Sequence, residues 1–210
     1  VAWGDYNNDG WLDFYVATGR AIVYGGDFYV NNGDGAFDER SVEAGITNAQ
    51  RRGRAPRWVD FDLDGDLDLF VANDKKDGAP NRLYRNDSDS TFTDIAAAAG
   101  LALDDGARGA AWADYDGDGY PDLALVMVSC PFKLFRGQLN GTWLETTGTS
   151  LIGEAWPRSL AWGDYDNDGD LDLYMSSAYR DFLDHVSWDA HSVETTLSTE
   201  WGEQEGLVLS

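Results

Sequence analysis

One nine-residue acidic motif occurs four times in this chain of 210 residues, and it restricts the possible folds more than any other feature. Aspartate or asparagine stands at positions 1, 3, 5 and 9 of the motif, and glycine stands at position 6. We call the copies loops one to four; they are Asp5–Asp13, Asp60–Asp68, Asp114–Asp122 and Asp164–Asp172. Four copies in register predict a fold built by repeating one unit.

The spacing of oxygen-bearing side chains in each loop is typical of a calcium site. Ca²⁺ binds six to eight oxygen atoms at about 2.3–2.6 Å, and a glycine permits the sharp turn of such a loop. The predicted side-chain ligands at the four sites are Asp5, Asn7, Asp9, Asp13, Asp60, Asp62, Asp64, Asp68, Asp114, Asp116, Asp118, Asp122, Asp164, Asp166, Asp168 and Asp172. Position 7 is predicted to offer only its backbone carbonyl, at Trp11, Asp66, Tyr120 and Asp170. Loop one has Asn7 in place of an aspartate, so we expect it to bind calcium most weakly.

The acidity of the chain is mostly a property of these loops. The formal net charge is −23, and fifteen of the 38 acidic residues occupy the predicted side-chain ligand positions. The chain would stay negative with four calcium ions bound, so the composition argues against nucleic acid and anionic membranes as partners. No stretch of the sequence is apolar for long enough to insert into a membrane.

The loops mark a regular repeat. Their first aspartates, at positions 5, 60, 114 and 164, define intervals of 55, 54 and 50 residues. A tryptophan precedes each loop by two residues and an aromatic residue occupies position 2: Trp3, Trp58, Trp112 and Trp162, then Tyr6, Phe61, Tyr115 and Tyr165. We interpret these aromatic residues as packing between neighbouring units. The units are approximately 1–55, 56–109, 110–159 and 160–210, within a single domain or domain segment.

Each loop leads into an apolar segment with the composition of a β-strand. These segments are 12–16, 67–72, 123–128 and 171–175. Farther along, residues 28–37 and 83–92 have Gly, Asn, Asp or Ser between alternating apolar residues, which is typical of a hairpin. The same offsets lead to Phe135 and Trp143 in the third unit and to His185 and Val193 in the fourth. With one strand entering each loop, the sequence predicts four strands per unit and an all-β fold.

The two ends of the chain match each other in sequence. Leu209-Ser210 followed by Val1-Ala2-Trp3 is similar to Ser159-Leu-Ala-Trp162, and joining the ends would make the last interval 51 residues. Repeats of about 40–50 residues with short strands are typical of β-propellers. Either four blades close through a seam at the termini, or the chain is a segment of a longer array. The start inside an expected strand, without a methionine, favours the segment.

The sequence Trp162-Gly-Asp-Tyr-Asp-Asn-Asp-Gly-Asp-Leu-Asp-Leu173, with Leu83-Tyr-Arg-Asn86 and Thr91-Phe-Thr-Asp-Ile95, resembles the FG-GAP and VCBS repeats, and the resemblance covers nearly the whole chain. Such repeats form the propellers of integrin α-subunits and of ASPIC/UnbV, cartilage-acidic-protein-like secreted proteins. The resemblance implies a β-propeller, usually of seven blades, with Ca²⁺ between the first two strands of a blade. Blades beyond the four visible ones, or further domains, are then expected.

Residues outside the repeat support simpler hypotheses. The basic run Arg51–Arg54 is interpreted as a solvated loop, with a surface for an acidic partner or a glycan as the alternative. His185 and His191 are interpreted as packing residues, because the sequence marks no further zinc ligands beside them. Cys130 is the single cysteine, which excludes an internal disulfide, and its apolar neighbours indicate a buried thiol.

Two functional classes fit the sequence. The first is a non-catalytic, calcium-binding module that binds a protein or carbohydrate, as in cell adhesion. The alternative is the propeller framework of a secreted polysaccharide lyase or hydrolase. Catalysis requires a unique set of residues, whereas nearly all carboxylates here are repeated, and no nucleophile elbow, His-Glu-x-x-His helix or phosphate loop occurs. We therefore expect no catalytic residues and no cofactor besides Ca²⁺. We also expect an extracellular location, secreted or at the cell surface, with the periplasm as a further option, because weak calcium sites stay empty in the cytosol.

Overall fold

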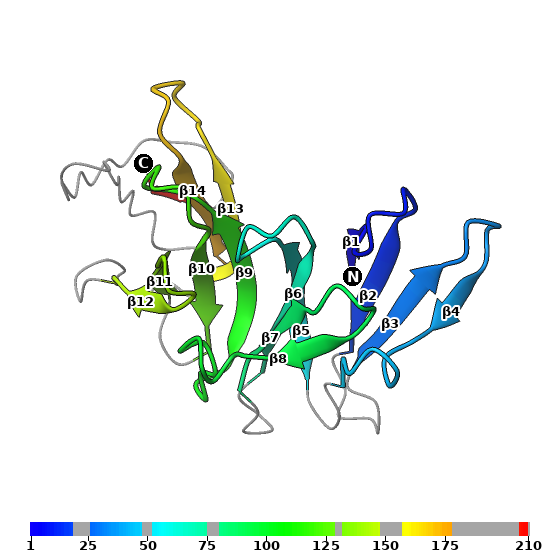
Figure 1. Cartoon of the computed structure of the whole chain (residues 1–210). Helices are drawn as coiled ribbons and strands as arrows, with labels where there is room; N and C mark the ends of the chain where they lie inside the picture. The colour runs from blue at the N-terminus through cyan, green and yellow to red at the C-terminus, as the bar shows by residue number, and fades with distance from the viewer. Residues whose placement is uncertain are drawn as a thin grey trace.

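Four antiparallel β-sheets follow one another along the chain (Figure 1). The computed structural model describes residues 1–18, 26–47, 52–74, 80–128, 132–147, 157–177 and 206–209, and these contain strands but no helix. The strands, sheet by sheet, are β1 (Ala2–Gly4), β2 (Asp13–Ala17), β3 (Gly26–Asn31) and β4 (Phe37–Glu39); β5 (Gly53–Val59), β6 (Asp68–Asn73), β7 (Arg82–Asn86) and β8 (Phe92–Asp94); β9 (Ala107–Ala113), β10 (Asp122–Met127), β11 (Phe132–Gly137) and β12 (Trp143–Glu145); and β13 (Pro157–Gly163), β14 (Asp172–Ser177) and β15 (Gly206–Leu209).

Each acidic loop connects the first two strands of its sheet. The strand after the loop begins at position 9 of the motif, and a hairpin adds the third and fourth strands in the first three sheets. β6 and β10 are buried along their whole length, which explains their nearly continuous apolar sequences. The predicted all-β fold is confirmed, and so are four strands per unit for the first three units.

The fourth sheet differs from the prediction. Its third strand is β15, which places Leu209 opposite Leu173. The corresponding residue of the first sheet is Tyr29, which pairs with Phe14. Leu209 therefore takes the position that the sequence spacing assigned to His185, and the inferred seam between the two chain ends is wrong. Equal spacing is a poor guide here because strand pairing depends on the facing strand and not on distance along the chain.

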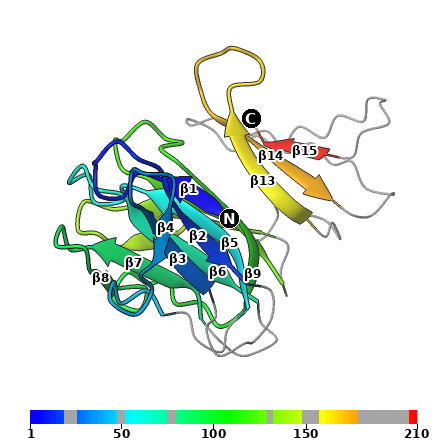
Figure 2. The same cartoon turned by 90° about the vertical axis from the view of Figure 1, so that its right-hand side faces the viewer.

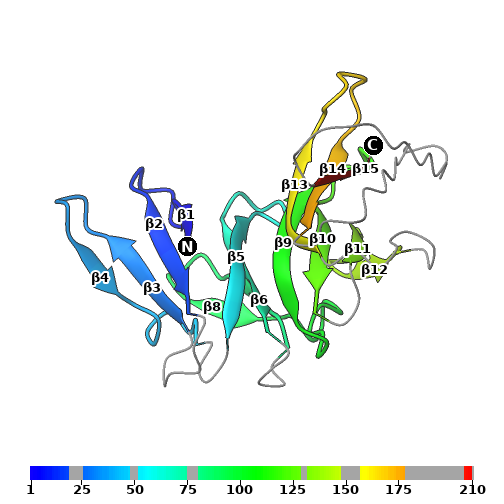
Figure 3. The ribbon, with the colours of Figure 1, turned by 180° about the vertical axis from the view of Figure 1, so that it is seen from behind.

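The sheets stand in a row in chain order (Figure 1 and Figure 3). β5 contacts β1 and β2, β9 contacts β5 and β6, and β13 contacts β9 and β10. Figure 2 shows β13, β14 and β15 standing apart from the first sheet. Among the described residues, the first and fourth sheets lie at opposite ends of the row. The alternative of a closed four-bladed ring is therefore wrong for this structure, which is an open row of propeller-like blades.

Aromatic side chains fill the space between the first two sheets. The Tyr6 ring, from loop one, lies 5.0 Å from the Phe28 ring and 5.7 Å from the Phe92 ring. Trp58 completes this cluster, with its ring 5.9 Å from Phe28. Edge-on and tilted ring pairs of this kind contribute about 0.5–1.5 kcal/mol beyond the area they bury. The packing interpretation of the repeated aromatic residues is thus confirmed at this junction.

The aromatic residues at the two ends of the row behave differently from the internal ones. Tyr115 stacks on Trp162 between the third and fourth sheets, with ring centres 5.8 Å apart and planes only 2° apart. In contrast, Trp3 of the first sheet is 56% exposed and Tyr165 of the fourth is 62% exposed. For these two residues, the packing interpretation stays a prediction, because the described residues include no sheet beyond either end of the row.

Some sequence-based hypotheses concern residues outside the described ranges: Arg51, Cys130, His185, His191 and Val193. Within the basic run, Arg54 forms an ion pair with Asp74 at 2.5 Å, between β5 and the end of β6. Gly53 and Arg54 belong to β5, so the loop interpretation of this run is wrong for these two residues. The described residues include no helix with the length and apolarity needed to cross a membrane.

Candidate metal centre

Each loop is closed by its own first aspartate. In loop two, the Asp60 carboxylate accepts hydrogen bonds from the backbone N–H groups of Asp64 and Gly65, both at 3.1 Å. Loops one and four repeat this pair, and loop three keeps the bond from its glycine. The position-6 glycines have φ values of 89–100°, a conformation that other residues rarely adopt. The role predicted for this glycine is confirmed.

Position 4 also needs a left-handed backbone, a requirement that was not predicted from the sequence. Asn8, Leu63, Gly117 and Asn167 have φ values of 56–69°. Asparagine and glycine tolerate this conformation, whereas another L-residue pays about 1–2 kcal/mol for it. Asparagine or glycine in three of the four loops was the available signal, and Leu63 obscured it.

The aspartate at position 9 ties each loop to its sheet. In the second sheet, the buried Asp68 carboxylate accepts hydrogen bonds from the N–H of Phe61, at 3.1 Å, and from the N–H of Asn86 in β7, at 2.7 Å. Asp13 and Asp122 accept the equivalent pairs, and Asp172 accepts the bond from position 2 of its loop. This structural role was not predicted. Its signal is an aspartate placed directly before an apolar strand.

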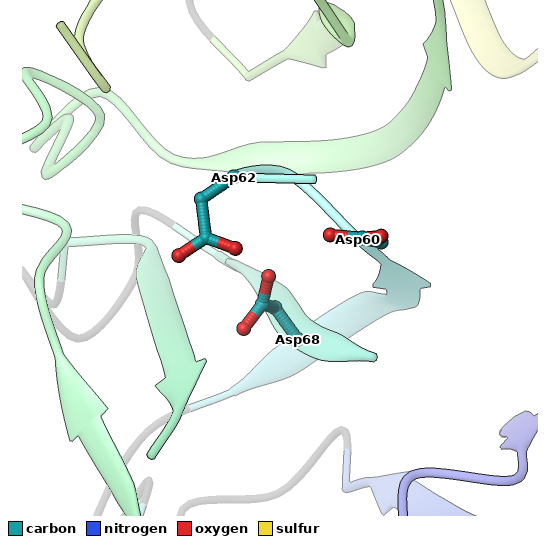
Figure 4. A group of neighbouring side chains, drawn as sticks. All are labelled: Asp60, Asp62 and Asp68. Atoms are coloured by element: carbon teal, nitrogen blue, oxygen red, sulfur yellow. The ribbon is translucent and has the colours of Figure 1, made fainter. Parts of the chain in front are cut away.

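Positions 1, 3 and 9 bring three carboxylates together in loops two, three and four. One oxygen of each residue lies within 4.8 Å of the other two. The triads are Asp60, Asp62 and Asp68; Asp114, Asp116 and Asp122; and Asp164, Asp166 and Asp172. Figure 4 shows Asp62 and Asp68 facing each other in loop two, with Asp60 beside them. Anionic oxygens at this spacing repel each other, so the donor set fits a hard divalent cation such as Ca²⁺.

Loop one lacks a complete triad, and positions 5 and 7 of the loops are not members of the triads. Loop one has Asn7 at position 3, which leaves the carboxylates of Asp5 and Asp13. At position 5, one carboxylate oxygen accepts the N–H of position 7 in all four loops, as between Asp64 and Asp66 at 2.9 Å. The described triads do not include position 5. The ligand roles of positions 5 and 7 therefore stay predictions.

Burial raises the pKa of the position-9 carboxyl groups. The pKa of Asp68 rises to about 8 and that of Asp122 to about 7, because burial disfavours the charged form and neighbouring loop carboxylates repel it, while backbone N–H donors act in the opposite direction. Burial raises the pKa of Asp13 and Asp172 in the same direction. Without a cation, the carboxyl groups of Asp68 and Asp122 retain protons toward neutral pH. A divalent cation would replace the proton and restore the carboxylate.

The raised pKa values predict an unusual pH dependence for the metal-free protein. Between about pH 4 and pH 8, folded Asp68 and Asp122 bind protons that the unfolded chain has released, so the free energy of unfolding falls as the pH rises. The slope is at most about 1.4 kcal/mol per pH unit for each group. Thermal melts of metal-free protein at pH 5 and pH 8 should show lower stability at pH 8. Added calcium should stabilise more at pH 8 than at pH 5, and a metal-free stability that rises with pH would contradict this account.

Loop three contains an internal cation. The Arg136 guanidinium contacts Asp116 at 2.6 Å and Asp118 at 2.8 Å, which are positions 3 and 5 of the loop. Arg85 has the same place in the second sheet but pairs with Asp87, which lies outside loop two. Arg136 therefore competes with a metal ion for the loop-three carboxylates, whereas Arg85 leaves the loop-two carboxylates available.

Replacing this arginine should strengthen calcium binding at loop three. Exposed ion pairs contribute about 0.2–1 kcal/mol each, so removing both with Arg136→Gln is expected to raise the affinity of this site about two- to thirtyfold. Calorimetric titration with calcium measures the change. Arg85→Gln is the matched control and should change the titration less, because Arg85 forms its ion pair with Asp87 outside loop two. Equal titrations for wild type and Arg136→Gln would show that the guanidinium does not compete with the ion.

A side-chain contact links loops one and two. The Asn8 side-chain N–H donates to the Gly65 carbonyl at 3.3 Å and to the Asp66 carboxylate at 2.9 Å. Asn8 stands at position 4 of loop one, and its partners stand at positions 6 and 7 of loop two. At position 4 of loops two and three, Leu63 and Gly117 have no side-chain donor. The contact therefore joins the first pair of loops and cannot be repeated by the next two.

Comparison with protein families agrees with this repeated geometry. The model of the FG-GAP-like repeat matches residues 5–71, 60–125 and 126–175, which is well over half of the chain. The chain belongs to the FG-GAP-like repeat family. All four acidic loops lie inside the FG-GAP-like matches, so the candidate metal centre is part of the repeat itself. A comparison with curated proteins finds no match.

Proposed function

We propose that this FG-GAP-like protein is a non-catalytic, calcium-binding interaction module that acts outside the cytoplasm. The carboxylate triads at positions 1, 3 and 9 of three loops carry the proposal, because their oxygens converge within 4.8 Å. Calcium neutralises the repulsion within each triad and holds the loop against its sheet. The row of sheets then presents its connecting segments to a protein or carbohydrate ligand.

The choice of calcium rests on the donors. Every triad oxygen is a carboxylate oxygen, which suits Ca²⁺, Mg²⁺ or Mn²⁺ and does not suit metals that prefer nitrogen or sulfur. Ca²⁺ accepts irregular geometry with six to eight ligands, whereas Mg²⁺ requires a near-ideal octahedron. A site with three converging carboxylates and further ligands predicted at positions 5 and 7 favours the larger ion.

The non-catalytic part of the proposal rests on symmetry. Perturbed pKa values often mark catalytic groups. Among the described carboxyl groups, those with a raised pKa are Asp13, Asp62, Asp68, Asp116, Asp122 and Asp172 in the loops, and Asp27 in β3. Six of these seven recur at equivalent loop positions, so their perturbation belongs to the repeated metal centre. A polysaccharide lyase or hydrolase would instead need a catalytic acid and a catalytic base that occur in one unit and are not repeated in the others.

The extracellular part of the proposal rests on calcium supply. Sites formed by short exposed loops, with ordinary affinity, fill where calcium is abundant and empty at cytosolic concentrations. The net negative charge also favours solubility and disfavours anionic surfaces.

Two measurements on the same calcium-loaded sample test the proposal. Equilibrium dialysis should find at least three calcium ions bound per chain. The protein is then applied to a glycan array, once in calcium and once in chelator, and it should bind glycans only in calcium. Incubation of the protein with a polysaccharide that it binds should release no new reducing or unsaturated ends. Fewer than three bound ions would refute the metal assignment, and release of new ends would favour the enzyme alternative.

A further inference from the structure

The first strands of the four sheets, β1, β5, β9 and β13, lie side by side across the row (Figure 3). Each of these strands forms one edge of its own sheet. We call the four strands the first-strand row. Each sheet contacts the preceding sheet through its first strand, so a further sheet at either end would lengthen the first-strand row without covering it.

The first-strand row is basic in an otherwise acidic chain. The chain has 38 acidic residues against 15 lysines and arginines, yet β5, β9 and β13 contain four arginines and no acidic residue. The arginines are Arg54, Arg57, Arg108 and Arg158. β1 contains no charged residue. The charge carried by these strands is therefore only positive.

Three of these arginines occupy the same place in their strands. They are Arg54, Arg108 and Arg158, and each precedes the tryptophan of its unit by four residues. The strand pairing shifts register at each of them. In β9, the residues on either side of Arg108 pair with consecutive residues of β10, so Arg108 is the extra residue of a β-bulge. A bulge redirects a side chain, and sheets pack about 10 Å apart, so the bulge arginines recur at about that spacing along the row.

The bulge arginines differ in their partners. Arg54 forms its ion pair with Asp74, at the end of β6. The residue equivalent to Asp74 in the third unit is Val128, which has no charge. Within the described part of the chain, neither Arg108 nor Arg158 has an ion pair. The repeat therefore places arginines in the row without repeating an acidic partner for them.

Arg57 breaks the repeat. The other three units have alanine at its position, directly before the tryptophan. The Arg57 guanidinium is half-buried and donates to the Pro56 carbonyl at 2.9 Å. Burial lowers the pKa of Arg57, and no carboxylate acts in the opposite direction. A half-buried cation without a counter-charge is unfavourable, and an anion from outside the chain would supply that charge. The sheets on both sides of β5 are described, so this environment does not depend on the ends of the row.

We propose that the first-strand row binds an acidic polysaccharide, whose uronate carboxylates pair with Arg57 and the bulge arginines. This inference rests on the carbohydrate ligand of the proposed function and specifies the charge of that ligand. A planar guanidinium binds one carboxylate through two parallel N–H···O hydrogen bonds, which suits a chain of sugars with single carboxylates.

The acidic loops leave room for such a ligand. Each bulge arginine lies six residues before the first aspartate of its loop, which is about 20 Å along an extended strand. At physiological salt, interactions between exposed charges are largely screened beyond about 8 Å. A uronate glycan has at most one carboxylate per sugar, whereas DNA has one charge per about 1.7 Å of its axis. The acidic chain therefore repels a nucleic acid more strongly than a uronate glycan.

Titration calorimetry of the calcium-loaded chain with oligogalacturonate tests the proposal. The methyl ester of the same oligomer has no charge and should not bind. Arg57→Ala should weaken binding about tenfold or more, and it introduces the residue that the other three units have, so the fold should persist. Arg108→Gln should weaken binding about two- to fivefold. Arg40→Gln is the control, because it removes the same charge directly after β4, at the opposite edge of the first sheet.

The outcomes separate this proposal from the proposed function. Three bound calcium ions without binding of the acidic oligomer, or equal binding of its methyl ester, would overturn the first-strand surface alone. Fewer than three bound ions would instead refute the metal assignment. Binding that Arg57→Ala and Arg108→Gln leave unchanged would place the carboxylates at the calcium ions and overturn the proposal. Oligoglutamate of equal charge that binds more tightly than oligogalacturonate would assign the surface to an acidic protein and overturn it equally. Thermal melts should show that each variant is folded.

Discussion

Removal of calcium is expected to lower the melting temperature of this protein by about 15–30 °C. A ligand present at 100 times its dissociation constant stabilises the folded state by about 2.7 kcal/mol per site. Three triads therefore contribute about 8 kcal/mol, and each kcal/mol shifts the melting temperature of a chain of this size by about 2–4 °C. The effect is large because, without a cation, each buried position-9 group must either hold a proton or remain charged beside two other carboxylates.

Differential scanning calorimetry in calcium, after chelation and after restoring calcium measures this shift. The restored sample should recover the original melting temperature, which separates metal removal from irreversible damage. Magnesium at the same concentration should recover less of it, because Mg²⁺ dehydrates reluctantly and requires octahedral geometry. A melting temperature that ignores all three treatments would mean that the triads do not bind an ion that supports the fold.

Two aspartates of the same triad are expected to respond differently to substitution. Asp62 is exposed and has only its predicted role as a metal ligand. Asp68 is buried and also accepts hydrogen bonds from the N–H groups of Phe61 and Asn86. In calcium, Asp62→Ala should cost about 2.7 kcal/mol, the contribution of one site. Asp68→Ala should cost about 5 kcal/mol or more, because each unsatisfied buried N–H adds about 1–3 kcal/mol.

The two variants separate further once calcium is removed. At pH 5, the raised pKa keeps Asp68 protonated in the folded protein. Metal-free Asp62→Ala should then have the same free energy of unfolding as metal-free wild type. Asp68→Ala should remain about 2 kcal/mol or more less stable, because the loss of backbone acceptors does not depend on the metal. Urea unfolding in both conditions gives these differences. Suppose that the two substitutions lower the free energy of unfolding equally in calcium and do not change it without calcium. Position 9 would then act only as a ligand.

The sequence predicted the repeat because both of its signals are local. Position 6 requires a positive φ, so Gly10, Gly65, Gly119 and Gly169 recur with the loops. β6 and β10 are nearly all apolar because they are buried on both faces, and all four strands after the loops were placed to within a residue or two. Local conformation and burial are readable in a single sequence.

The features that the sequence did not predict depend on distant partners. Asp68 joins a loop to a strand whose pairing residue, Asn86, lies 18 positions away. Leu209 reaches its place in the fourth sheet through pairing with Leu173, which equal spacing along the chain does not reveal. The exposure of Trp3 and Tyr165 follows from their places at the ends of the row, and in sequence they are indistinguishable from Trp58 and Tyr115. A repeat pattern specifies the unit but not its neighbours.

If the first two loops bind calcium as proposed, the contact from Asn8 to Asp66 should couple their two sites. An ion that orders loop two fixes the carbonyl and carboxylate that Asn8 contacts, and so reduces the entropy that loop one must lose when it binds its own ion. Loop one has one carboxylate fewer than the other loops, so we expect this coupling to help it bind its ion. We then expect the first two loops to fill as a pair over a narrow range of calcium concentration, and loops three and four, which lack such a contact with their neighbours among the described residues, to fill independently.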